Sequence, residues 1–228
     1  MTTVPVNMTK KPEPHETYVH GHHWRSAEDE KDAAKLGMWL FLGTEALMFS
    51  GFFCAYAVFR MLYFDTWHES SKYYLNWKIG GFNTLVLLIS SFTIVQAIRG
   101  AQLGRKMMAF WYLAATNVCA LTFLVVKLGW EYLPKIQKGE LPGGFFTYGH
   151  GPAGTTHDQV FLGIYWVATA THGLHVLIGV FIIGWCMIRT MKGHFGPKNY
   201  MFLENTGLYW HIVDIIWIFL FPMLYLVG

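Results

Sequence analysis

Charged residues are scarce in this sequence of 228 residues, and the shortage narrows the class of protein at once. Asp, Glu, Lys and Arg together make up 14% of the chain, whereas 54% of it is hydrophobic and 18% aromatic. A typical soluble domain has about 25% charged residues, and its apolar residues recur periodically instead of standing in blocks as they do here. The composition therefore excludes a mainly disordered chain, argues against a soluble α/β enzyme and indicates an integral membrane protein.

Three further signals are missing from the sequence. It has only three cysteines, Cys54, Cys119 and Cys186, each inside an apolar block, and no CxxC pair of the kind that holds a thiolate-bound metal. The balance of 17 Lys and Arg against 14 Asp and Glu gives a net charge of +3 without a basic run, so we expect no nucleic-acid partner. No apolar stretch follows the start of the chain, so we expect no signal peptide.

Five apolar blocks carry most of the sequence, at about 36–59, 79–98, 107–130, 160–188 and 208–227. Each is close to the roughly 20 residues that a helix needs to cross the hydrocarbon core of a bilayer. Continuous apolar runs of this length are helices rather than barrel strands. We therefore expect an all-α integral membrane protein, a bundle of five transmembrane helices over 34–228, preceded by a polar cytoplasmic arm over 1–33.

The distribution of basic residues predicts the orientation of the bundle. Eleven of the 17 Lys and Arg residues lie in the N-terminal arm or in the second-to-third and fourth-to-fifth connections. The positive-inside rule therefore places the N-terminus in the cytoplasm and the C-terminus outside. The long connection 134–157, rich in Gly and Pro, then falls on the outer face and is expected to be irregular. A docking loop for a further partner and a plain linker both fit this connection.

Glu45 stands inside the first apolar block. It follows Leu36 by nine residues, which corresponds to about 13–14 Å of helix at 1.5 Å per residue. An ionised carboxylate near the middle of a bilayer costs several kcal/mol or more, so Glu45 is expected to be protonated, partnered or turned toward a polar crevice. A functional acid and a structural carboxyl that joins two helices are the two interpretations.

Histidines mark the fourth and fifth blocks. His172 and His175 are three residues apart and share a helix face, so they would bind a metal if another helix supplied a third ligand, or else hydrogen-bond neighbouring helices or lipid head groups. His211 and Asp214 have the same spacing, which favours a buried pair. Asn83 is a candidate for interhelical hydrogen bonding. In the arm, a His-rich tract forms a weak candidate metal site: His15, His20, His22 and His23.

Four segments of the chain, over about 35–228, carry distinctive motifs. Residues 35–49 read Lys-Leu-Gly-Met-Trp-Leu-Phe-Leu-Gly-Thr-Glu-Ala-Leu-Met-Phe, with a glycine, an apolar run, Thr-Glu and Met-Phe. Residues 82–93 read Phe-Asn-Thr-Leu-Val-Leu-Leu-Ile-Ser-Ser-Phe-Thr, and residues 171–176 read Thr-His-Gly-Leu-His-Val. Residues 209–217 read Tyr-Trp-His-Ile-Val-Asp-Ile-Ile-Trp and follow Glu204. Together these segments resemble the motifs of subunit III of the haem–copper oxidases, and they occur in that family's order.

The resemblance implies the shorter, five-helix bacterial form of the subunit, in the cytoplasmic membrane, with its helices split by a lipid-filled cleft. It implies an accessory chain without a catalytic residue, metal or redox centre of its own. The haem and copper belong to partner subunits I and II, whose complex reduces oxygen to water and pumps protons. The chain would support assembly, bind phospholipids and sustain proton uptake by subunit I. Glu45 matches the buried family carboxylate that reacts with hydrophobic carbodiimides.

The resemblance also selects candidate residues for the lipid cleft and for subunit contacts. They are Glu45, Asn83, Glu131, Tyr132, His172, His175, Glu204, Trp210, His211, Asp214 and Trp217. One departure stands beside them, because Lys127 occupies a position where the family has Gln.

Other classes of protein remain open at this stage. Within the family, the alternatives are subunit III of a quinol oxidase and the related accessory protein of nitric oxide reductase. A membrane di-iron oxygenase would use histidine boxes, which the clusters around His20 and His172 faintly resemble. A proton-coupled transporter would use Glu45 and Asp214, but would be expected to show repeated halves or broken helices.

Overall fold

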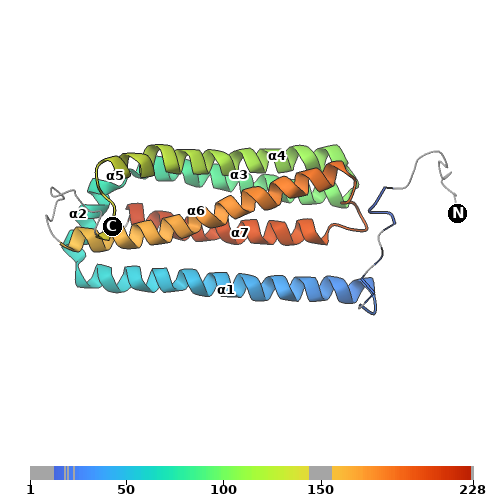
Figure 1. Cartoon of the computed structure of the whole chain (residues 1–228), viewed down its shortest axis with the longest axis horizontal. Helices are drawn as coiled ribbons and strands as arrows, with labels where there is room; N and C mark the ends of the chain where they lie inside the picture. Colours follow the sequence, from blue (N-terminus) through green and yellow to red (C-terminus); the bar gives the residue numbers. More distant parts are fainter. Residues whose placement is uncertain (1–12, 18, 20, 23, 144–155, 227–228) are drawn as a thin grey trace.

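Five long helices build the protein (Figure 1). A computed structural model describes residues 13–17, 19, 21–22, 24–143 and 156–226, and at 156 and 157 it describes the backbone alone. The long helices are α1 (Ala27–Leu62), α3 (Trp77–Gln102), α4 (Lys106–Val126), α6 (Thr156–Met191) and α7 (Met201–Phe221). Each is long and apolar enough to cross a membrane, α4 together with its continuation to Gln137. The prediction of an all-α bundle with five membrane-spanning helices is confirmed.

Helix α1 begins earlier than the sequence analysis expected. Ser26 accepts a hydrogen bond at its Oγ from the backbone N–H of Asp29, 3.1 Å away, and this N-cap fixes the first turn. The acidic residues of that turn also suit the positive end of the helix dipole. The last seven residues of the polar segment 1–33 are therefore helical.

A short helix, α2 (Phe64–Tyr74), follows α1 and lies at one end of the bundle, which we call the α2 end (Figure 1). The sequence analysis did not predict it. Its Ser70 Oγ donates a hydrogen bond of 2.5 Å to Asp158 Oδ1 of α6. Its Ser71 Oγ donates one of 2.7 Å to the backbone carbonyl of Leu224. Helix α2 thus joins the start of α6 to the end of the chain.

The continuation of α4 changes its winding at the α2 end. A π-helical segment, η1 (Lys127–Tyr132), leads into α5 (Leu133–Gln137), and a second, η3 (Pro222–Leu226), continues α7. The expectation that 134–157 is irregular is wrong at both edges, because α5 continues through its first residues and α6 begins at Thr156. Pro134 is tolerated because it lies in the first turn of α5. Residues 144–155 of that connection lie outside the described residues.

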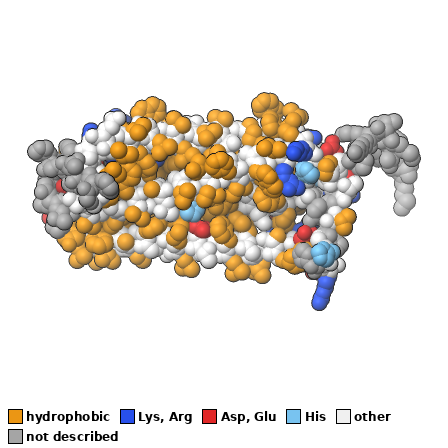
Figure 2. All heavy atoms as spheres, in the orientation of Figure 1, with side chains coloured by type: hydrophobic (Ala, Val, Ile, Leu, Met, Phe, Trp, Pro, Cys, Tyr) orange, Lys and Arg blue, Asp and Glu red, His pale blue; other side chains and the backbone are white. Residues whose placement is uncertain are grey.

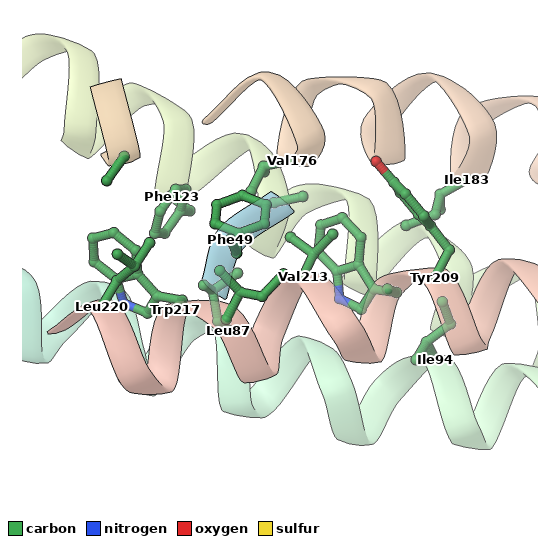
Figure 3. Packing of buried hydrophobic residues seen from close by; sticks show 14 of the residues in the cluster. Phe49, Leu87, Ile94, Phe123, Val176, Ile183, Tyr209, Val213, Trp217 and Leu220 are labelled. Atoms are coloured by element: carbon green, nitrogen blue, oxygen red, sulfur yellow. The ribbon is translucent and has the colours of Figure 1, made fainter. Parts of the chain in front are cut away.

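Helices α3, α4, α6 and α7 pack around one core, and α1 lies along the side of α6 and α7. Figure 3 shows how α7 fills this core, with Trp217, Val213 and Tyr209 turned toward the side chains of α3 and α6. In the most apolar stretch of α7, 50% of residues are buried, but only 11% in that of α1. On the face shown in Figure 2, hydrophobic side chains extend along the length of the bundle. Helix α1 therefore offers most of its apolar surface to lipid or to another chain.

Candidate functional site

Glu45 of α1 and His175 of α6 form a pair, and both line a pocket within the membrane-spanning length of the bundle. Their facing atoms, Glu45 Oε2 and His175 Nε2, are 2.9 Å apart, and the two side chains are 17% and 14% exposed. The pocket, of about 400 Å³, lies between α1, α6 and α7 and is lined mostly by apolar side chains such as Met38, Ile178 and Tyr209. A partner was one of the three alternatives that the sequence left open for this buried acid, and the partner is a histidine 130 residues further along the chain.

The second nitrogen of His175 determines what the pair can do with a proton. Nδ1 lies 2.8 Å from the backbone carbonyl of Thr171, and a carbonyl only accepts, so Nδ1 carries a hydrogen. If the ring is neutral, Nε2 has no hydrogen and must accept one from protonated Glu45. If the ring is charged, Nε2 donates to the Glu45 carboxylate. In both forms the pair shares one proton and has no net charge, which is the inexpensive state in a low-dielectric pocket.

The backbone around this pair is held by neighbouring rings. Tyr209 of α7 donates a hydrogen bond of 2.9 Å from its hydroxyl to the carbonyl of His175. Phe49, one turn after Glu45, packs edge-on against the His175 ring at a centroid distance of 5.5 Å. Helices α1, α6 and α7 therefore all contribute to the position of one acid–base pair.

The expected pairing of His211 with Asp214 is wrong. His211 turns its Nδ1 to Ser91 Oγ of α3, 2.7 Å away. Asp214 is 2% exposed, and neither of its carboxyl oxygens has a hydrogen-bond partner within the described part of the chain. A spacing of three residues places two side chains on one helix face but does not oblige them to meet when a neighbouring helix offers a closer partner.

Two more candidates, Asn83 and His172, lie in the core. Both are at most 1% exposed, and among the described residues neither side chain has a hydrogen-bond partner for its nitrogen or oxygen atoms. The His172 ring stacks on Trp217 at a centroid distance of 5.1 Å and meets Phe123 edge-on. His172 therefore points into the core of the bundle, whereas His175 points to the pocket beside α1. The two histidines lie in different environments.

The two tryptophans of the last motif tie α7 to α3. Trp210 Nε1 donates to Ser90 Oγ at 2.9 Å, and Trp217 Nε1 donates to Thr84 Oγ1 at 3.0 Å. Glu204, by contrast, is half-buried in the first turn of α7, at the end of the bundle away from α2. It is not among the residues that line the pocket at Glu45.

A second buried cluster, at the α2 end, centres on Lys127 and Glu131 of η1. The two side chains are 3% and 4% exposed and form an ion pair. Tyr225 donates to Glu131 Oε1 at 2.6 Å, and Tyr165 donates to Oε2 at 3.3 Å. Tyr132 instead donates to Thr169 Oγ1, at 2.8 Å. The rings of Tyr132, Tyr165, Trp217 and Tyr225 all lie 5.0–5.6 Å from Lys127 Nζ, a cation–π arrangement.

The sequence analysis noted Lys127 only as a departure from the family pattern and missed its role. The signal was present, because Lys127 and Glu131 are four residues apart and therefore adjacent on a helix. Tyr165 and Tyr225 come from α6 and η3, and no local pattern connects them to this pair.

The candidate ligands for a metal do not gather in the described part of the chain. Among those residues, no group of three or more His, Cys, Asp or Glu side chains is placed to hold a metal ion. In the predicted His-rich tract, His15 donates a hydrogen bond from Nδ1 to the backbone carbonyl of Gly193, 3.0 Å away. His20 and His23 lie outside the described residues.

These features define a class, a multi-pass helical membrane protein with an acid–histidine pair in a pocket within its membrane-spanning length. A family profile described as cytochrome c oxidase subunit III matches residues 12–228, and the chain belongs to this family. The chain is 33% identical over 220 residues to cytochrome c oxidase subunit 3 of Marchantia polymorpha, covering 93% of this chain and 74% of the relative. For the same subunit of Gallus gallus the identity is 32% over 220 residues, covering 93% and 76%. For that of Thermostichus vulcanus it is 32% over 204 residues, covering 88% and 90%. The resemblance read from the motifs is thus confirmed.

Proposed function

We propose that the chain is the accessory subunit III of a haem–copper terminal oxidase in a bacterial cytoplasmic membrane. In this proposal it contains no redox centre, and haem and copper are held by subunits I and II. It supports the assembly of the complex, binds phospholipids and sustains proton uptake by subunit I while oxygen is reduced to water. The N-terminus lies in the cytoplasm and the C-terminus outside.

The Glu45–His175 pair is the observation that carries the proposal. A pocket of about 400 Å³ with mostly apolar walls and one acid–base pair suits an amphiphilic lipid better than a soluble substrate. A single proton between these two atoms, which are 2.9 Å apart, can move from the carboxyl to the imidazole without changing the net charge of the pair. Such a pair forms a polar site within the bilayer.

The weak burial of α1 supports the same proposal. With only 11% of its most apolar stretch buried, α1 leaves a long apolar surface for subunit I and for lipid in the pocket beside it. We propose that the remaining candidates keep the other four helices in the shape that this surface needs: Asn83, Glu131, Tyr132, His172, Glu204, Trp210, His211, Asp214 and Trp217.

Replacing Glu45 by Gln tests the proposal in the assembled complex. The Gln amide donates to His175 Nε2 as the protonated acid does, so the subunits should assemble and early oxygen consumption should match the wild type. Reaction with a hydrophobic carbodiimide should be lost at this position, and activity per complex should fall faster over many turnovers. Glu69→Gln, which removes an exposed carboxylate from α2, is the matched control and should change neither readout.

Two outcomes distinguish this role from others. If E45Q assembles fully but consumes no oxygen from the first turnover, Glu45 carries chemistry that the proposal does not assign to it. E45K places a cation in the pocket next to His175, at a cost of roughly 2.5–3.5 kcal/mol on insertion scales, and should impair assembly. Normal assembly of that variant would contradict the burial of the pair.

A further inference from the structure

A polar cavity of about 420 Å³ opens at the α2 end of the bundle, on a different side from the pocket at Glu45. It lies between the end of α2, the start of α3 and the segment from η1 to residue 140. Tyr73, Asn76 and Trp130 line its rim, and Lys135, Lys138 and Glu140 contribute charge. Trp77 is the first residue of its span, and Trp130 is the last residue of the apolar block 107–130. Tryptophan is enriched at the boundary between hydrocarbon and head groups. The cavity is therefore at head-group level.

The charges around this cavity sum to a positive value. Lys135 is 6% exposed and donates one hydrogen bond to the carbonyl of Tyr74, and an ammonium group has three donors. Lys138 is exposed. Glu131 also borders the cavity, but its charge is offset by Lys127. Two lysines against Glu140 leave a net charge of +1 when all three groups are charged.

An apolar groove continues from the cavity along the outer face of α3 and α4. It has a volume of about 370 Å³ and is lined by Phe82, Val118, Leu121, Val125 and Trp130, all exposed. Trp130 lines both the cavity and the groove, so the two adjoin.

The length of the groove matches one leaflet of a bilayer. Val118 precedes Trp130 by twelve residues, which corresponds to about 18 Å along the helix axis. Half of a hydrocarbon core of about 30 Å is about 15 Å. A chain that starts beside Trp130 and follows the groove would therefore end near the middle of the membrane.

We propose that the cavity and the groove form one binding site for an anionic phospholipid of the leaflet at the α2 end. Its phosphate binds between Lys135 and Lys138, and one acyl chain lies in the groove between α3 and α4. A net charge of +1 complements a phosphodiester, and the apolar groove at the same rim distinguishes a lipid from a free phosphate ion. In Figure 1, α3 and α4 lie on the far side of the bundle from α1, so this lipid is separate from any lipid in the pocket at Glu45.

Lipid titration of the chain, purified in mild detergent with its associated subunits, tests the head-group half of the site. The probes are phosphatidylglycerol and phosphatidylcholine with the same acyl chains, and native mass spectrometry measures the lipid retained. K138Q should weaken phosphatidylglycerol binding about fivefold, the contribution of one lysine near an anionic lipid. E140Q removes the opposing charge and should strengthen it by a similar factor. K72Q, at an exposed lysine of α2 outside the cavity, should leave it unchanged.

A second pair of variants tests the acyl half. V125W fills the groove and should reduce retained phosphatidylglycerol, whereas V167W, at an exposed valine of α6, should not. Phosphatidylcholine bound as tightly as phosphatidylglycerol, and unaffected by K138Q, would overturn the anionic preference. Displacement of the lipid by inorganic phosphate, together with no effect of V125W, would show an anion site and overturn the lipid proposal.

Discussion

The buried ion pair of Lys127 and Glu131 gives the sharpest stability prediction. E131Q keeps the shape of the side chain and the oxygen that accepts from Tyr225, but it leaves the Lys127 ammonium without a counter-charge at 3% exposure. Breaking one partner of a buried pair typically costs about 3–5 kcal/mol. In E131Q, Lys127 has the alternative of releasing its proton and becoming neutral. Because neutralising an ordinary lysine at pH 7 costs about 4.6 kcal/mol, this value is an upper limit on the destabilisation by E131Q.

The aromatic rings around Lys127 lower this penalty. Four rings lie within 5.6 Å of its Nζ, and a desolvated cation–π contact is worth about 2 kcal/mol. We therefore expect E131Q to destabilise the protein by about 3 kcal/mol. The double variant K127Q/E131Q removes both charges, so it should lie within about 1 kcal/mol of the wild type. The predicted coupling between the two positions is then at least about 2 kcal/mol.

Equilibrium unfolding in mixed micelles, followed by tryptophan fluorescence, measures this coupling as a double-mutant cycle. K127Q is the remaining single variant of the cycle. If E131Q costs under 1 kcal/mol, or if the double variant is less stable than both single variants, the assignment of a charged, mutually compensating pair is refuted.

Two further predictions concern packing and pH. A Cβ added at Gly179 would lie 2.5 Å from the buried ring of Trp210, so G179A should destabilise the bundle by about 1–3 kcal/mol in the same unfolding assay. A Cβ added at Gly173 would have nothing within 4 Å, so G173A should be near neutral. Burial raises the pKa of Glu140 from 4.5, so the folded state binds its proton more tightly and stability should fall as the pH rises just above 4.5. E140Q should flatten that fall in a thermal-unfolding series from pH 4 to 7, and an unchanged slope would contradict the burial of this carboxyl.

The five spans could be predicted because a bilayer imposes length and composition on each helix separately. The start of α1 could also have been predicted, since Ser26 followed three residues later by Asp29 is a capping pattern. The sequence analysis used only the apolar block, which begins later. Helix α2 was missed because its buried side chains include Ser70 and Ser71, which do not look apolar.

The polar contacts were less predictable than the helices. The burial of Glu45 implied a partner, but nothing in the local sequence selects His175 from the other histidines, because the choice depends on how α1 lies against α6. The same limit explains the wrong pairing of Asp214 with His211, whose actual partner, Ser91, comes from α3. Local spacing determines which side chains share a face, and tertiary packing determines which of them meet.

The separation of 130 residues between Glu45 and His175 has a consequence for how the chain is made. At a synthesis rate of about 5–20 residues per second, Glu45 is synthesised roughly 7–26 s before His175. Its mean hydropathy of 1.4 is the lowest of the five spans. During that interval the acid must either enter the bilayer carrying its own proton or remain beside the insertion machinery. The last helices to be translated thus complete the membrane integration of the first.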